Sequence, residues 1–133
     1  MWTEPKTNWA ATDYFNLSDY NRIKNHINEL WEMAQIVFPE FSISPMGNDI
    51  TDYNHVWDIT EINRIENNLE TIFQNVKYQI SIGNKQTFSY NGLFIQYQEL
   101  NRIENATLNI YNRLKNQISA RKTLEFELGG VQF

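Results

Sequence analysis

Cysteine is absent from this chain of 133 residues, and histidine occurs only twice. Without cysteine the protein has no disulfide bond, no thiolate nucleophile and no zinc site of the cysteine type. The two histidines, His26 and His55, lie in different segments, and neither has a second histidine at metal-ligand spacing. We therefore expect no bound metal and no cofactor.

The motifs of common enzyme classes are missing too. The sequence contains no glycine-rich phosphate loop, no G-x-S-x-G nucleophile elbow and no H-E-x-x-H zinc motif. Two pairs of glutamates, Glu29 with Glu32 and Glu66 with Glu70, are interpreted as parts of solvated helix faces. The chain is predicted not to be an enzyme. A small enzyme such as a cell-wall hydrolase, with catalytic groups from distant parts of the chain, stays open as an alternative.

A surplus of positive charge is lacking as well, because 11 lysines and arginines face 16 acids and give a net charge of −5. Binding along nucleic acid requires a basic face, so nucleic acid is not an expected partner. Basic residues do gather late in the chain, interspersed with glutamates, and they keep a nucleic-acid-binding or regulatory protein open as the alternative. These residues are Arg102, Arg113, Lys115, Arg121 and Lys122.

No apolar run approaches the roughly 20 residues that span a bilayer. The first residues, from Met1 to Thr7, lack the basic and apolar regions of a signal peptide. We expect a protein made in a cytoplasm, with no membrane partner. With 41% hydrophobic residues the chain has enough apolar material for one core, so residues 1–133 are predicted to form a single domain.

A motif of seven residues is present in three copies and organises the chain. Each copy reads acid, apolar, Asn, Arg, Ile, a charged residue and Asn. The copies are Asp19-Tyr20-Asn21-Arg22-Ile23-Lys24-Asn25, Glu61-Ile62-Asn63-Arg64-Ile65-Glu66-Asn67 and Glu99-Leu100-Asn101-Arg102-Ile103-Glu104-Asn105.

Apolar residues continue each copy at alternating spacings of three and four, which is the pattern of one face of a helix. The sequence therefore predicts a mainly α protein, in which three amphipathic helices, over residues 18–36, 59–78 and 97–119, pack as a small bundle. Ser18 and Thr60 are predicted to be N-caps, and Gln98 takes that place in the third copy. The predicted seam consists of Tyr20, Ile23, Ile27, Leu30 and Ala34, then Ile62, Ile65, Leu69, Ile72 and Val76, then Leu100, Ile103, Thr107, Ile110, Leu114 and Ile118.

An acid precedes the arginine of each copy by three residues, which predicts an ion pair in the first helical turn. Such a pair contributes only about 0.2–0.5 kcal/mol, so helix energetics alone do not explain the repeated Asn-Arg. Arg22, Arg64 and Arg102 have two interpretations. Each packs over a helix end and bonds a nearby carbonyl, or some of them bind a neighbouring subunit.

The segments around the helices carry the remaining signals. Residues 1–17 form an aromatic N-terminal arm with Trp2, Trp9, Tyr14 and Phe15, whose rings pack over the helices or bind another protein. Turn signals within residues 78–92 predict a minor β-hairpin. The tail over residues 120–133 alternates apolar and acidic residues and is predicted to be a C-terminal strand, a type of docking surface. Its apolar residues are Leu124, Phe126 and Leu128.

The stretches from Trp2 to Trp9, Asp13 to Asn16 and Asp19 to Ile23 together resemble small tail-region structural proteins of phages and prophages that infect Gram-positive bacteria. The phrase from Leu100 to Asn105 resembles one near the N-termini of tail-fibre and baseplate proteins. One departure is Lys24, where the other copies have glutamate, and no long fibre domain follows.

The resemblance implies a non-enzymatic structural protein of the virion, located in the tail region and made in the cytoplasm of the host bacterium. It implies an adaptor or connector that holds copies of itself, as a homo-oligomer, or neighbouring tail or baseplate proteins. The alternative is then a small helical nucleic-acid-binding or regulatory protein of phage origin. The candidate interface consists of Trp2, Trp9, Tyr14, Phe15, Arg22, Arg64, Arg102, Leu124, Phe126 and Leu128.

Overall fold

Three helices dominate the computed structural model, which describes residues 2–52, 59–76, 83 and 96–128. They are α1 (Leu17–Val37), α2 (Ile59–Val76) and α3 (Tyr97–Leu128). The predicted mainly α architecture is confirmed, and all three helix starts agree with the prediction to within one residue. The predicted hairpin over residues 78–92 lies outside the described residues, apart from Gly83.

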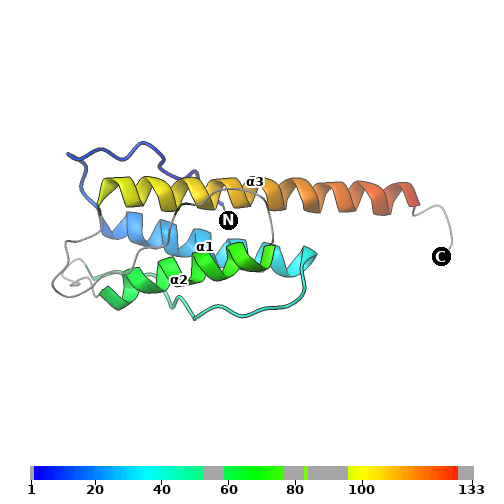
Figure 1. Cartoon of the computed structure of the whole chain (residues 1–133), viewed down its shortest axis with the longest axis horizontal. Coiled ribbons are helices and arrows are strands. Elements are labelled where there is room, and N and C mark those ends of the chain that lie inside the picture. Colours follow the sequence, from blue (N-terminus) through cyan, green and yellow to red (C-terminus); the bar gives the residue numbers. More distant parts are fainter. Residues whose placement is uncertain (1, 53–58, 77–82, 84–95, 129–133) are drawn as a thin grey trace.

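All three helices run in the same direction, so their N-termini lie at one end of the bundle (Figure 1). Contacts along α1 and α3 agree with this arrangement, because Arg22 meets Glu104 near the two starts and Arg121 meets Ile36 near the end of α1. Parallel helices require the chain to return to the starting end before each new helix. The segment from Phe38 to Asp52 begins such a return from the end of α1.

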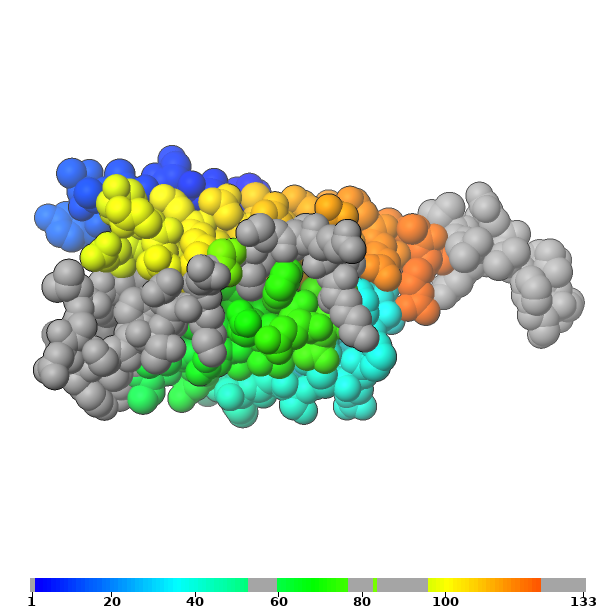
Figure 2. Space-filling model, in the orientation of Figure 1, coloured from blue at the N-terminus to red at the C-terminus, as the bar shows by residue number. Residues whose placement is uncertain are grey.

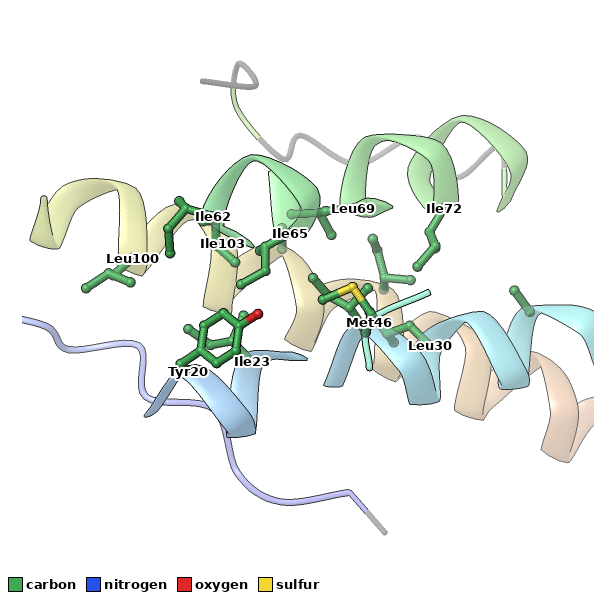
Figure 3. Packing of buried hydrophobic residues seen from close by; sticks show 14 of the residues in the cluster. Tyr20, Ile23, Leu30, Met46, Ile62, Ile65, Leu69, Ile72, Leu100 and Ile103 are labelled. Carbon is green, nitrogen blue, oxygen red and sulfur yellow. The ribbon is translucent and has the colours of Figure 1, made fainter. Parts of the chain in front are cut away.

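The core forms where the three apolar faces meet (Figure 3). Every predicted seam residue from Tyr20 to Leu114 is buried, and only Ile118 is partly exposed. The seam prediction is therefore confirmed up to Leu114. Two residues outside the helices, Trp9 and Met46, are also buried in this cluster. Met46 lies beside Leu30 in Figure 3, so the returning segment contributes to the core as well.

The helix starts differ in detail from the prediction. Asn16 rather than Ser18 is the N-cap of α1, and the carboxylate of Asp19 accepts a hydrogen bond of 2.9 Å from the backbone N of Asn16. Thr60 lies inside α2, which begins at Ile59. The predicted Ser18 and Thr60 caps are therefore wrong. The prediction relied on a serine or threonine that precedes an acid. Asparagine is an equally good N-cap, and Asn16 stands two residues before Ser18.

The predicted C-terminal strand is also wrong, because α3 continues through Leu124 and Phe126 to Leu128. Alternation at a spacing of two defines one face of a strand but not of a helix. The residues from Thr123 to Leu128 have few helix breakers, and they extend a helix that is already formed, which needs no new nucleus. Residues 129–133 lie outside the described residues.

Two extended segments lie along the helices, and polar groups of the helices bind them at every third residue. In the segment that follows α1, these contacts fall at Phe41, Ser44, Gly47 and Ile50. In the N-terminal arm they fall at Thr3, Lys6 and Trp9. Most of these contacts use backbone groups of the extended segments, which have no neighbouring strand to satisfy them. Figure 2 shows the arm along the first half of α3.

Candidate functional site

The sixth residue of every motif copy is charged and buried. Lys24, Glu66 and Glu104 are exposed by 1%, 2% and 0% of their surface. Our interpretation of Glu66 as part of a solvated face is therefore wrong. A buried charge requires a partner and further hydrogen bonds, so these three positions must each be satisfied by other parts of the chain.

Glu104 accepts hydrogen bonds from three residues, which lie in two parts of the chain, α1 and the N-terminal arm. Its carboxylate accepts hydrogen bonds from Nε and Nη2 of Arg22 at 3.0 and 2.9 Å. It also accepts one from the backbone N of Lys6 at 3.0 Å, and a short one from the indole Nε1 of Trp9. The carboxylate thereby joins α3 to α1 and to the N-terminal arm. Four charge-assisted hydrogen bonds of this kind are stronger than neutral ones.

Arg102 forms the second cross-helix pair, with the buried carboxylate of Glu66. Its Nη2 lies 2.6 Å from Oε2 of Glu66, and its Nε donates to Glu99 at 2.7 Å. These hydrogen bonds raise the pKa of Arg102 although its burial opposes them. The predicted first-turn pair of Glu99 with Arg102 is confirmed, as is that of Asp19 with Arg22. The pairing of Glu61 with Arg64 stays a prediction.

The two pairs follow one cyclic order around the bundle. The arginine of α1 binds the sixth motif residue of α3, and the arginine of α3 binds that of α2. The third step would join Arg64 of α2 to the sixth residue of α1, which is Lys24, and two cations do not pair. Lys24 instead binds Asp49 at 2.6 Å and the carbonyl of Gly47 at 3.1 Å. Lys24, which replaces the glutamate of the other two copies, is therefore paired with the returning segment.

The asparagine at the third motif position binds the backbone of an extended segment. Asn101 accepts a hydrogen bond from N of Trp9 at 2.7 Å and donates one to the carbonyl of Trp9 at 3.0 Å. Asn21 does the same with Ile50, at 3.0 and 2.8 Å. A side-chain amide can satisfy both groups of one residue in this way, as a neighbouring strand would. Motif copies one and three therefore share this role.

Aromatic stacking fixes the beginning of the arm. The ring of Trp2 stacks on Tyr111 of α3 at a centroid distance of 3.9 Å and on His26 of α1 at 4.2 Å. The Nε2 of His26 lies 3.0 Å from Oγ1 of Thr3, whereas its buried Nδ1 has no hydrogen-bond partner among the described residues. Burial, together with the nearby charge of Arg22, lowers the pKa of His26 from its ordinary value of 6.5 to about 4, although the hydrogen bond with Thr3 opposes this shift.

The predicted interface residues have different environments. Trp9 is buried, Trp2 and Phe15 are partly buried, and all three pack against the core. Arg22 and Arg102 form the internal pairs described above, and Arg64 is partly buried. Tyr14 is 83% exposed. Of the candidates whose side chains the structure describes, Tyr14 is therefore the most available to a partner.

A shallow hollow of about 340 Å³ lies beside Tyr14, at the end where the helices begin. Its walls come from residues 9–15, just before α1, and from the start of α3. Tyr97, another exposed aromatic, lines it together with Phe15 and Leu100. The hollow combines apolar walls with aromatic rings that carry a hydroxyl, a composition suited to contact with a protein side chain.

Gly83 passes directly over the guanidinium-bearing side chain of Arg102. A Cβ there would lie 2.5 Å from Cδ of Arg102, and φ is +74°. We predict that Gly83→Ala lowers the free energy of unfolding by about 2 kcal/mol or more, because backbone strain and a displaced Arg102 add together. Gly47→Ala is the matched control, since φ is +76° but a Cβ would have nothing within 4 Å. Equal losses in urea denaturation would contradict this assignment.

Within residues 2–52, 59–76, 83 and 96–128, no cluster of three or more His, Cys, Asp or Glu could hold a metal ion. In the same ranges, none of the helices combines the length and the apolar character needed to cross a membrane. Comparisons of the chain with protein families, with characterised proteins and with solved structures find no significant match.

Proposed function

We propose that this protein is a non-enzymatic structural component of a phage tail or baseplate, an adaptor that holds copies of itself or neighbouring tail proteins in a fixed geometry. The observation that carries the proposal is the exposed aromatic end of the bundle. Tyr14 and Tyr97 border a hollow at the end where all three helices begin. Tyrosine is a favoured anchor in protein interfaces because it offers a large ring and a hydrogen-bonding hydroxyl.

The buried charges support an architectural role for the motif. Two ion pairs join helices inside the chain and hold them in register. They are Arg22 with Glu104 and Arg102 with Glu66. A connector must keep its docking end in one orientation, and buried polar networks can specify one arrangement of helices. The sequence resemblance to phage tail-region proteins adds support for the tail as the location.

The nucleic-acid alternative depends on the basic residues of the second half of α3. Arg113, Lys115, Arg121 and Lys122 are exposed. At about 100° per residue along a helix, Arg113 and Lys115 point about 160° apart, so these residues do not form one basic face. Salt-dependent retention of the protein on immobilised DNA would favour this alternative over the tail proposal.

Mass spectrometry of purified phage particles tests the proposal. We expect the wild-type chain in particles, and we expect Tyr14→Ser to reduce its incorporation at least several-fold with unchanged thermal stability, because that ring is exposed. Glu32→Gln, on an exposed part of α1, is the control and should be incorporated normally. Absence of the wild-type chain from particles would refute the virion location, and normal incorporation of Tyr14→Ser would refute the docking end.

A further inference from the structure

The first part of the predicted N-terminal arm, residues 2–9, binds its own helices in the manner of a short peptide ligand and is called the arm from here on. Its hydrogen bonds to the helices come from Thr3, Lys6 and Trp9, and they reach partners 23, 98 and 92 to 95 residues away in the chain. We call the helical residues that receive it the arm-binding surface, which consists of His26 of α1 with Asn101, Glu104 and Tyr111 of α3.

Recognition of the arm is local and self-contained. Two tryptophans anchor it, Trp2 by stacking and Trp9 by burial beside Glu104. Between them, Glu104 and Asn101 bind backbone groups of Lys6 and Trp9. None of these contacts requires that the arm continue into the same molecule's α1. A peptide of this sequence carries everything that the arm-binding surface recognises.

The chain that joins the arm to α1 is weakly held. Residues 10–14 and Asn16 are exposed, and only Phe15 in this stretch packs against the core. The stretch is held by one turn, in which N of Asp13 donates to the carbonyl of Ala10 and N of Ala10 donates to the carboxylate of Asp13, both at 2.9 Å. The pair of Lys6 with Asp13 is partly exposed, and such pairs contribute little to stability. This hinge, residues 10–14, lies before the packed ring of Phe15 and the N-cap Asn16, so it can change direction without disrupting the helical core.

We propose that the arm-binding surface also accepts the arm of a second copy of this chain, so that neighbouring molecules exchange arms. The second copy is the partner because its arm is identical to the one that already fits. This inference rests on the proposal that the protein holds copies of itself, and it names the contact between those copies. Exchange of an identical element costs little, since every contact of the closed form is made again.

Concentration decides between the closed and exchanged forms. A short tether gives the arm of the same molecule an effective concentration on the order of millimolar. In dilute solution the closed monomer should therefore dominate, and exchange becomes favourable where copies are crowded together, as in an assembly. Shortening the hinge removes this advantage, because each deleted residue shortens the reach of the extended chain by about 3.5 Å.

Light scattering coupled to size exclusion tests the exchange. We expect deletion of residues 10–12 to convert the full chain into a dimer, and Trp9→Ala in that background to return it to a monomer. Insertion of three Gly and Ser residues after Ala10 is the control and should stay monomeric. A folded, monomeric deletion variant would overturn the proposal, as would a dimer that persists after Trp9→Ala.

A second measurement covers the case in which the deletion variant does not fold. A fluorescent peptide of residues 2–16 is added to full-length Trp9→Phe, whose own arm loses the indole donor to Glu104. We expect this peptide to bind at least tenfold more tightly than the same peptide carrying Trp9→Ala. Equal or absent binding would overturn arm exchange. The detection of the chain in phage particles would be unaffected, so the two proposals can fail separately.

Discussion

Glu104→Ala should lower the free energy of unfolding by about 3–5 kcal/mol, the range observed when one partner of a buried ion pair is removed. The substitution removes the fully buried one of the two carboxylates that pair with the guanidinium of Arg22, which is 19% exposed, and leaves it with Asp19. It also removes the acceptor of the Trp9 indole and of the Lys6 backbone N. Since small domains have about 5–15 kcal/mol of stability, much of the population could unfold.

Urea denaturation followed by circular dichroism measures this loss. Glu32→Ala is the matched control, because Glu32 is an exposed glutamate on α1, and it should change the stability by less than about 0.5 kcal/mol. We also expect Trp9 to become more accessible to a fluorescence quencher in Glu104→Ala. A loss below about 1 kcal/mol would show that Glu104 does not hold the arm and α1 together.

Acidification should destabilise the protein through His26. The folded-state pKa is about 4 against an ordinary value of 6.5, so between these pH values the unfolded chain binds more protons than the folded one. The contribution is therefore complete above pH 6.5 and is lost progressively as the pH falls toward 4. A pKa difference of one corresponds to about 1.36 kcal/mol. The free energy of unfolding should therefore fall by roughly 2 kcal/mol between pH 7 and pH 5.

Denaturation profiles of three proteins isolate this effect. His26→Gln should have a flatter pH dependence than the wild type between pH 5 and 7. His55→Gln, which removes the other histidine, should keep the wild-type slope. Because protonated His26 would place a charge in a buried site near the charge of Arg22, Trp2 should also become more exposed near pH 4. Parallel profiles for wild type and His26→Gln would contradict the assignment.

Local spacing predicted the helices and their buried faces well. The alternation of three and four residues from Tyr20 onward follows directly from the helical period, so the seam could be identified without tertiary information. The C-terminal strand was predicted from alternation that a long helix overrides, and the N-cap was assigned to serine when Asn16 stood two residues earlier. These errors arise because short patterns fit more than one backbone conformation.

The buried network could not be predicted from local spacing. Glu66 and Glu104 look like exposed helix acids, and only the arrival of an arginine from another helix makes their burial tolerable. Asn101 and Trp9 are separated by 92 residues. One signal was available, because the motif starts at residues 19, 61 and 99, at nearly even intervals. Each interval is long enough for one helix and for a segment that returns to the starting end. Such spacing indicates parallel helices.

The internal pairs also change the interpretation of the three arginines. Substitution of Arg22 or Arg102 alters the fold itself, so loss of assembly in such variants would not identify an interface. The exposed ring of Tyr14 is a better probe, because it is 83% exposed and its loss should leave the core intact. Assembly and folding can thus be tested at different residues of this chain.

A double-mutant cycle between Arg22 and Glu104 tests most directly whether the repeated motif joins the helices. The free energies of unfolding of wild type, Arg22→Met, Glu104→Leu and the double variant are compared. We predict a coupling energy above about 1.5 kcal/mol, in the upper part of the range for residues in contact. Losses that add within about 0.5 kcal/mol would mean that this pair does not hold α1 to α3, and would contradict the account.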